Sequence, residues 1–376
     1  MSRLAVLVSF SGEGGVERMM LNLVEAIVAR GIEVDLLAIR ADSAHLAALP
    51  DGVRRIDLGV RHSLSSVRPL ARYLRDERPE AMLIAKDRAI RAAVLARSLA
   101  RVPCRIVGRL GTNLSAALEG RPALTRWLRT APMRPLYAGV EHVVCVSAGV
   151  LDDTAALTRL PRSRLSVVPN PVVTPRLALL ARATPEPPLP AGSGRFGMPL
   201  IVGAGRLTEQ KDFATLIRAF ALLRRTRPAR LAILGDGRDR AALLALARSL
   251  DVADDLVLPG FLPNPWAWMA RAQLFVLSSR WEGSPNVLTE ALALGVPAVA
   301  TDCPSGPREL LRDGAIGPLV SVGNAPELAA AMAATLDRPP PAHTLREAVT
   351  EHTAEVAAGR YLERLGLAPG KDRRSA

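Results

Sequence analysis

Short apolar runs alternate with stretches of helical periodicity along most of the chain. In the first half, the runs expected to form strands are 4–10, 34–39, 81–85, 105–107, 143–147 and 165–168. In the second half, they are 200–203, 231–234, 256–258, 274–277, 296–300 and 319–320. Strands buried on both faces read as continuous apolar runs, so the pattern predicts two parallel sheets covered by helices and an α/β fold class.

Helical periodicity fills the stretches between these runs. The expected helices are 16–30, 213–225, 238–250, 287–294, 325–336 and a last amphipathic helix at 343–365. The stretch 170–199 is rich in Pro, Ala and Gly, which is typical of a linker. We therefore expect an N-terminal Rossmann-like domain at 1–175, a linker at 176–199, a C-terminal Rossmann-like domain at 200–342, and a terminal helix with a basic tail at 343–376.

The segment 278–310 is expected to place a loop directly before a helix. Ser284 suits the N-cap of that helix, and Pro285 suits its first position. The free N–H groups and the positive dipole end at a helix start favour an anion such as a phosphate. Glu290 lies five residues after Pro285, which is about 7–8 Å along the helix axis and roughly the step from a diphosphate to its ribose. The alternative is that Glu290 is a solvated helix residue, which its apolar neighbours argue against.

Composition excludes several classes of protein. Hydrophobic residues make up 49% of the chain and charged residues 23%, as in globular proteins. The sequence contains no run of about 18 uncharged apolar residues that would span a bilayer, and residues 1–10 lack the pattern of a signal peptide. The three cysteines are odd in number and widely spaced, so we expect reduced thiols and a cytoplasmic protein.

The formal net charge of +13 is concentrated in the first half of the chain. Residues 88–134 hold ten arginines and one acidic residue, Glu119. Such a field attracts anionic lipid, a diphosphate-linked acceptor or nucleic acid, although an aromatic content of 3% disfavours nucleic acid. An arginine-rich composition overall, with 46 Arg to 3 Lys, explains the charge equally well.

Apolar residues are interspersed among these arginines. They are Leu124, Trp127, Leu128 and Met133. The segment therefore either docks on anionic headgroups at the inner face of the cytoplasmic membrane or covers the first domain as an ordinary basic helix face.

Two motifs carry a resemblance to a known family. Glu282 and Glu290 are separated by seven residues, and GRLTEQKDF occupies 205–213. With these motifs the chain resembles the retaining glycosyltransferases of family 4, over most of 1–335 and most densely at 200–322. The resemblance implies the GT-B fold, in which two Rossmann-like domains have parallel sheets facing a central cleft and a final helix crosses back onto the first domain.

The resemblance also implies roles for individual residues. As catalytic groups it implies Arg206, Lys211 and Glu282, the two cations on the leaving diphosphate and the carboxylate on a hydroxyl of the donor sugar. As donor-binding residues it implies Gly15, Phe261, Ser284, Asn286, Val287 and Glu290. Gly15 closes the glycine-rich loop 11–15, Phe261 marks the main chain that reads the nucleobase, and Glu290 contacts the ribose.

One feature departs from the family pattern. Many members have a histidine after the strand that corresponds to 105–107, but 108–115 reads GRLGTNLS. Arg109, Thr112 and Asn113 are the candidates to contact sugar or acceptor in its place. The five histidines of the chain show no metal-ligand spacing, so we expect neither a metal nor any cofactor apart from the donor.

The resemblance implies a metal-independent, retaining transferase. It would move a hexose or N-acetylhexosamine from a UDP-sugar to a lipid-linked or saccharide acceptor in cell-envelope glycan synthesis, without a nucleic-acid partner. The alternatives are a sugar-nucleotide epimerase or phosphorylase of the same fold, and a non-catalytic protein that binds nucleotide sugars. A phosphorylase would be expected to carry a cofactor-bearing lysine, which the scarcity of lysine disfavours.

Overall fold

The computed structural model describes residues 3–10, 15–41, 46, 49–190, 192 and 197–367. The chain forms two compact units. Unit 1 comprises Met1–Pro171 and Thr353–Ala376, and unit 2 comprises Val172–His352. Among the described residues, no helix combines the length and apolar character needed to cross a bilayer.

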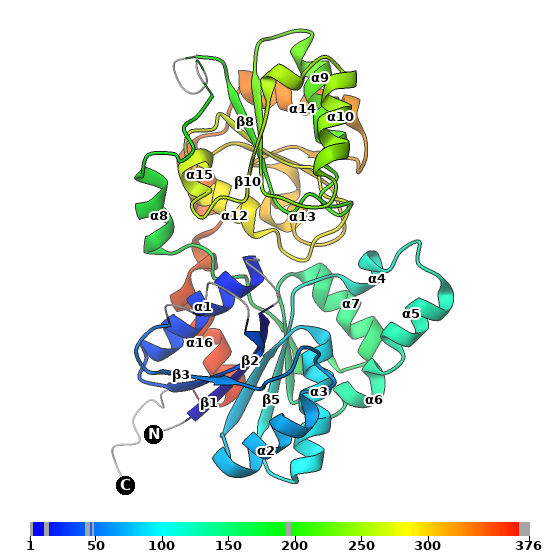
Figure 1. The fold of residues 1–376 in the computed structure, drawn as a ribbon, viewed down its shortest axis with the longest axis vertical. Helices are drawn as coiled ribbons and strands as arrows, with labels where there is room; N and C mark the ends of the chain where they lie inside the picture. Colours follow the sequence, from blue (N-terminus) through cyan, green and yellow to red (C-terminus); the bar gives the residue numbers. More distant parts are fainter. Residues whose placement is uncertain are drawn as a thin grey trace. The chain divides into compact units, whose positions relative to one another are not determined.

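Unit 1 contains a parallel sheet of seven strands (Figure 1). The strands are β1 (Arg3–Phe10), β2 (Glu33–Ala41), β3 (Val53–Asp57), β4 (Ala81–Ala85), β5 (Arg105–Leu110), β6 (His142–Cys145) and β7 (Leu165–Val167). Their order is β3-β2-β1-β4-β5-β6-β7, with the point of reversal between β1 and β4. The sequence pattern missed β3, because its residues VRRID are mostly exposed at the sheet edge and form no apolar run.

Helices cover both faces of this sheet. They are α1 (Gly15–Val28), α2 (Val67–Glu77), α3 (Asp87–Ala100), α4 (Leu114–Ala117), α5 (Ala123–Thr130), α6 (Met133–Tyr137), α7 (Ala148–Thr158) and α16 (Ala354–Leu365). Alternate strand residues such as Met82 and Ile84 pack with α2, α3, α6 and α7 in one core cluster. Helices α1 and α16 lie against each other, and α16 also contacts β4 and β5 (Figure 1).

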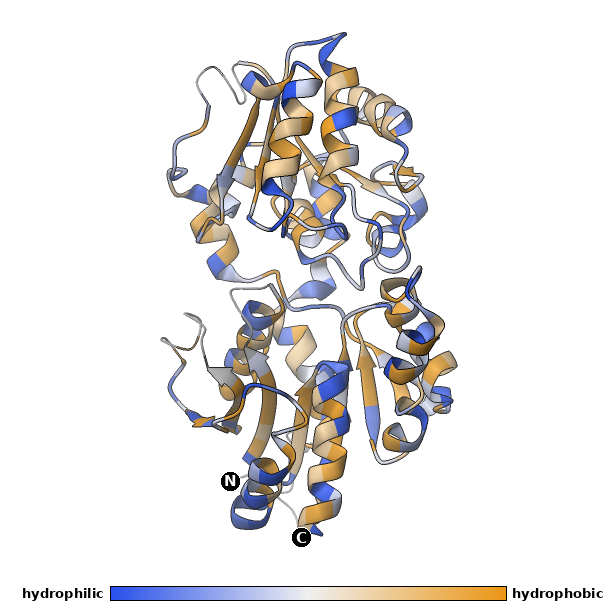
Figure 2. Cartoon of the chain, turned by 45° about the vertical axis from the view of Figure 1, so that its right-hand side comes forward, coloured by the Kyte–Doolittle hydropathy of each residue, from blue (hydrophilic) through white to orange (hydrophobic). Residues whose placement is uncertain are grey.

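Unit 2 repeats this plan with six parallel strands. They are β8 (Leu200–Ala204), β9 (Arg230–Leu234), β10 (Leu256–Gly260), β11 (Leu274–Leu277), β12 (Ala298–Thr301) and β13 (Leu319–Val320), in the order β10-β9-β8-β11-β12-β13. All six expected strands are present. The two α/β units with parallel sheets confirm the expected fold class, and Figure 2 shows apolar strands beneath helices whose outer faces are polar.

Two layers of helices enclose the sheet of unit 2. The helices are α8 (Pro175–Arg182), α9 (Phe213–Arg224), α10 (Arg240–Ser249), α11 (Trp266–Met269), α12 (Asn286–Ala293), α13 (Pro307–Leu310), α14 (Ala325–Asp337) and α15 (Ala342–Glu347). Helices α9, α10 and α14 pack in one core cluster. Helices α8, α11, α12, α13 and α15 contribute to the other.

The structure differs from the expected boundaries at both places where the chain passes from one unit to the other. The stretch expected as a linker, 176–199, begins inside α8, whose Leu177 and Ala181 are buried in the core of unit 2. The single helix expected at 343–365 is instead α15, a 3-10 turn at Thr350–His352, and α16. Thr353 starts α16 as its N-cap, accepting a hydrogen bond from the backbone N–H of Val356 at 3.3 Å. A new helix therefore begins where the chain returns to unit 1.

One buried histidine couples the stability of unit 1 to pH. His142 begins β6, is 6% exposed, and lies 2.8 Å from the Ser166 hydroxyl through Nε2. Burial and the nearby positive charges of Arg364, Arg105 and Arg164 lower the pKa of His142 to about 4. In the unfolded chain a histidine has a pKa of about 6.5, so between these values only the unfolded state binds the proton.

We therefore expect unit 1 to lose about 2–3 kcal/mol of unfolding free energy as the pH falls from about 6.5 to 4. The variant His142→Gln should lack this part of the pH dependence. Urea unfolding at pH 7 and pH 4.5 measures it, with the exposed His343→Gln as the matched control. An equal change in unfolding free energy between pH 7 and pH 4.5 for the wild type and His142→Gln would contradict the assignment.

Candidate functional site

The loops that follow the strands of unit 2 meet at one edge of its sheet. Because all six strands are parallel, their carboxyl ends lie together there, as in other doubly wound sheets. The loop after β8 carries Arg206 and Lys211, the loop after β11 carries Glu282, and β10 leads into Phe261. Residues predicted from distant parts of the sequence are thus brought to a single edge.

Lys211 and Glu282 form an ion pair at this edge. The Lys211 ammonium lies 2.5 Å from Oε1 of Glu282, and the two side chains are only 15% and 8% exposed. The hydroxyl of Ser279 donates to the same carboxylate oxygen at 2.7 Å. A charge this deeply buried requires a partner, and here each side chain supplies one for the other.

Main-chain contacts hold the two loops in register. Ser278 donates its hydroxyl to the carbonyl of Lys211 at 2.8 Å. Gln210 accepts a backbone N–H from Arg280 at 2.8 Å and donates its side-chain amide to the Trp281 carbonyl at 2.9 Å. The positions of Lys211 and Glu282 are therefore fixed by backbone as well as by their own charges.

Glycines allow the neighbouring loops to approach each other. Gly205 has φ +150°, and a Cβ there would lie 2.9 Å from Cε of Lys211. Gly235, with φ +135°, would place a Cβ 2.1 Å from the carbonyl oxygen of Gly205. The turn LGDG at 234–237 is therefore a structural part of the site, because only glycine permits this contact. Sequence reasoning missed this role, although glycines directly after a strand were its signal.

The loop before α12 forms the other side of the edge. Helix α12 begins at Asn286 with Pro285 in the cap position and no side-chain cap, so the expected Ser284 N-cap is wrong by one residue. The loop after β12 packs on this turn: a Cβ on Gly306 would lie 2.7 Å from Cδ of Pro285. Glu290 is 1% exposed, which excludes the alternative that it is a solvated residue.

The other predicted residues of unit 2 are more open. Arg206 is exposed, and so is Phe261, to 51%. Ser284, Asn286 and Val287 are half-buried around the start of α12. The Arg206 guanidinium and the positive dipole end of α12 are features of this edge that favour an anion.

Two of the three candidates to replace the expected histidine have structural partners in unit 1. Arg109 is 2% exposed and donates from Nη2 to Oδ1 of Asn170 at 2.6 Å. Asn113 caps α4 by accepting the Ala116 N–H at 3.0 Å. Thr112 is exposed. The structure thus places Arg109 in the interior and leaves Thr112 as the accessible candidate of the three.

The end of β4 carries a pair that sequence reasoning did not connect. Lys86 donates to the Ser9 carbonyl at 2.8 Å and lies 3.1 Å from Oε1 of the buried Glu17. Its φ of +77° is unusual for a residue with a Cβ. The rarity of lysine in the chain was the available signal. Gly15 is the exposed first residue of α1, and positions 11–14 of the expected glycine-rich loop lie outside the described residues.

Comparisons with known proteins agree with this arrangement. The model of glycosyl transferases group 1 matches residues 195–352, and the model of Glycosyltransferase Family 4 matches residues 13–176. Each unit is therefore matched by a glycosyltransferase family model. The chain belongs to glycosyltransferase family 4.

The matches to individual relatives differ in how much of this chain and of the relative they span. The lipopolysaccharide core biosynthesis glycosyltransferase LpsE of Rhizobium meliloti is 27% identical over 366 residues, 94% of this chain and 93% of its own. An N-acetylgalactosaminyltransferase of Campylobacter jejuni that acts on a diphospho-undecaprenol acceptor is 43% identical over 124 residues, but this match spans only 33% of either protein. Anabaena HepE, solved in complex with UDP, has a TM-score of 0.73 at 18% identity and covers 97% of this chain and 100% of its own. This likeness confirms the GT-B fold.

Cys303 lies beside Glu282 at the carboxyl edge of the unit 2 sheet but is not equipped to react. It is 3% exposed, and burial, followed by the negative charge of Glu282, raises its pKa to about 12. Burial also raises the pKa of Cys104 to about 12 and that of Cys145 to about 11. Within the described ranges, no group of three His, Cys, Asp or Glu side chains could hold a metal ion.

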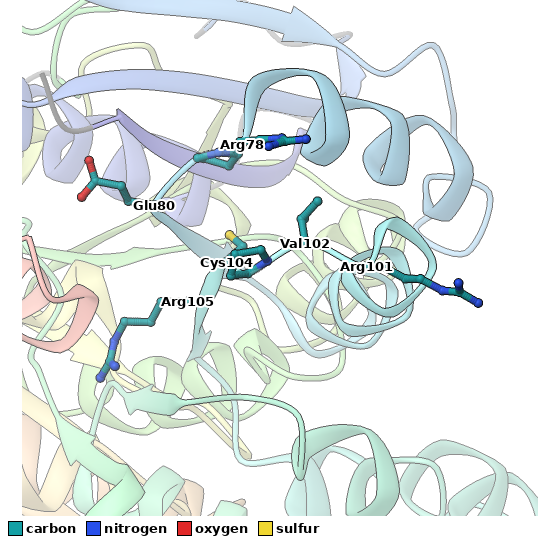
Figure 3. Close-up of a pocket in the computed structure, with 8 residues that line it drawn as sticks. Arg78, Glu80, Arg101, Val102, Cys104 and Arg105 are labelled. Atoms are coloured by element: carbon teal, nitrogen blue, oxygen red, sulfur yellow. The ribbon is translucent and has the colours of Figure 1, made fainter.

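A cavity of about 540 Å³ lies elsewhere, at the amino ends of β4 and β5. It is lined by Arg78, Pro79, Glu80, Arg101, Val102, Pro103, Cys104 and Arg105. Figure 3 shows the three arginine side chains pointing in different directions, so they do not converge on a common anion. This cavity lies at the amino edge of the unit 1 sheet, whereas the predicted residues of unit 1 lie at the carboxyl ends of its strands.

We expect Gly205→Ala to lower transferase kcat/KM by about 100-fold, since a misplacement of about 1 Å in an active site costs that much. The added methyl would displace Lys211 and strain the backbone. The control is Gly323→Ala, which has φ +77° and open space around its Cβ. Equal losses in the two variants would show that strain, not Lys211, is responsible.

We also expect all three cysteines to resist iodoacetamide at pH 8 in the folded protein, because they are buried and their thiolates are disfavoured. Mass spectrometry of native and guanidinium-unfolded samples measures the labelling. Rapid native labelling of Cys303 would refute its inert placement.

Proposed function

We propose that the protein is a retaining, metal-independent glycosyltransferase that uses a UDP-sugar donor held by unit 2. The observation that carries this proposal is the buried Lys211–Glu282 pair at the carboxyl edge of the sheet. It lies on the same edge as the Arg206 guanidinium and the start of α12, which supply a second cation and the positive end of a helix dipole. These groups suit a leaving nucleoside diphosphate.

The chemistry follows from the charge that develops. The bond between the anomeric carbon and the diphosphate oxygen breaks, and a bond to the acceptor oxygen forms on the same face. The departing phosphate takes the acceptor proton, so no protein nucleophile is needed. Lys211 and Arg206 stabilise the developing negative charge in place of a metal. Glu282 orients a sugar hydroxyl, and this role is supported by the Lys211 and Ser279 contacts to its Oε1.

The finer identity of the substrates is proposed by analogy. UDP is favoured because HepE was solved with it. A hexose or N-acetylhexosamine, passed to a lipid-linked or saccharide acceptor of the cell envelope, is favoured by the functions of the Rhizobium and Campylobacter relatives. In this proposal Glu290 meets the ribose and the main chain at Phe261 meets the nucleobase. Gly15 contacts the donor diphosphate, and Thr112 contacts sugar or acceptor.

The alternatives make different predictions about the acceptor. A sugar-nucleotide epimerase would convert the donor with no acceptor present. A non-catalytic binding protein would bind the nucleotide and release nothing. UDP-, GDP- and ADP-sugars, each incubated with and without a lipid extract and with and without EDTA, distinguish these cases. Release of UDP that requires the extract and survives EDTA supports the proposal, and any other pattern contradicts it.

The variant Lys211→Ala should lower kcat on the order of 100- to 1,000-fold, the typical cost of removing a charge-stabilising group. It also leaves Glu282 buried without its cation, so folding is checked by thermal unfolding. A second variant, Arg206→Ala, removes an exposed cation and tests the same role without that risk. Arg225→Ala, just beyond α9, is the control. Near-wild-type kcat in both Lys211→Ala and Arg206→Ala would remove these residues from the mechanism.

A further inference from the structure

We propose that α5 of unit 1 is a docking surface for an anionic lipid bilayer, into whose headgroup region it inserts Leu124, Trp127 and Leu128. The surface is defined by this helix and the exposed arginines around it, Arg121, Arg126 and Arg134. The proposal concerns a surface of unit 1, away from the carboxyl edge of the unit 2 sheet, and does not rest on the proposed function.

The apolar side of α5 faces solvent. Leu124, Trp127 and Leu128 are 67%, 62% and 57% exposed, and the helix has no buried residue. In the described part of the chain, no other helix exposes three large apolar side chains. The three lie within an arc of about 100° at 100° per residue, so they form one continuous face.

The polar side of the same helix turns toward the protein. Arg129 and Thr130 are half-buried, whereas the apolar residues are exposed. Burial, and then the positive charge of Arg88 at the start of α3, lower the pKa of Arg129. A helix that packs on a soluble core buries its apolar face, and α5 does the reverse.

The segment that carries α5 is anchored to the rest of unit 1 on both sides. At one end, Asp153 of α7 accepts the Leu114 N–H at 2.7 Å. At the other, Met133 and Tyr137 of α6 are buried, and the Tyr137 hydroxyl lies 3.1 Å from Asp87. Residues 119–128 between these ends are all exposed. The structure thus presents α5 as a projection, so Leu124, Trp127 and Leu128 do not cover unit 1, whereas Met133, the fourth apolar residue of the segment, is buried in its core.

Charge and side-chain chemistry favour lipid over other partners. Glu119 is the one acidic residue among ten arginines in 88–134. An exposed tryptophan with leucines on one face and arginines on the opposite face is the composition of an interfacial helix on anionic lipid. A nucleic-acid surface would be expected to offer several aromatic platforms, and α5 offers only Trp127.

Vesicle co-sedimentation of the full chain tests the proposal. The wild type should bind vesicles of phosphatidylglycerol and phosphatidylethanolamine but not phosphatidylcholine alone. Replacing Leu124, Trp127 and Leu128 together by Ser should weaken binding by about tenfold or more. Arg121→Gln combined with Arg126→Gln should weaken it on the order of tenfold, and added salt should do the same. All five positions are exposed, so the variants should fold.

Matched controls distinguish binding through this surface from non-specific binding to vesicles. Leu64→Ser removes a 74% exposed leucine elsewhere in unit 1, and Arg72→Gln with Arg75→Gln removes two exposed arginines of α2. Neither should change binding. Trp127 emission should shift to the blue on vesicles, and Trp127→Phe should abolish that shift while keeping the binding, since the other three tryptophans belong to unit 2, where Trp266 and Trp268 are buried and Trp281 is half-buried.

Three results would overturn the proposal. One is no binding to anionic vesicles, and another is binding that the triple Ser variant retains. The third is capture of RNA, or dimerisation, through these residues while vesicles are ignored, which would make α5 a nucleic-acid or protein interface.

Discussion

At the carboxyl edge of unit 2, an ammonium group and a carboxylate lie 2.5 Å apart with little access to water. Removing either would leave the other as a buried charge without compensation, which is among the costliest states for a folded chain. The backbone around them is arranged accordingly. Gly205 leaves space for the Lys211 stem, Gly235 lets the next loop touch the first, and Ser279 shares the Glu282 oxygen. The carboxyl edge of unit 2 is therefore a set of loops whose spacing is fixed by one charge pair.

Unit 1 contains a comparable constraint at a different place. Arg109 is buried in β5, donates to Asn170 just before the chain enters unit 2, and hydrogen-bonds Tyr361 of α16 just after it returns. Burial lowers the pKa of this guanidinium and raises that of Tyr361 to about 12. Arg109, which the sequence offered as a possible sugar contact, thus links the sheet of unit 1 to the segment that leaves the unit and to the helix that follows the return. Its role in the structure is to hold these segments together.

The two units divide the chemical work in the proposed reaction. Unit 2 supplies cations and helix N–H groups suited to a diphosphate. Unit 1 combines a basic surface with an apolar helix face turned to solvent. An acceptor that is itself lipid-linked would be met at a membrane, so a docking helix on unit 1 is chemically consistent with that acceptor. The docking surface and the transfer reaction nevertheless have separate tests, because vesicle binding needs no turnover.

The sequence by itself determined the α/β class, twelve of the thirteen strands and the family, because continuous apolar runs and the spaced Glu282 and Glu290 are local signals. It could not reveal β3, whose exposed edge residues carry no apolar run, nor the break between α15 and α16, which a single Thr353 cap decides. Only the tertiary structure showed that Arg109 is buried, that Glu290 is not solvated, and that the apolar face of α5 points outward. Burial depends on which segments pack on a side chain, and those partners lie tens to hundreds of residues away along the chain.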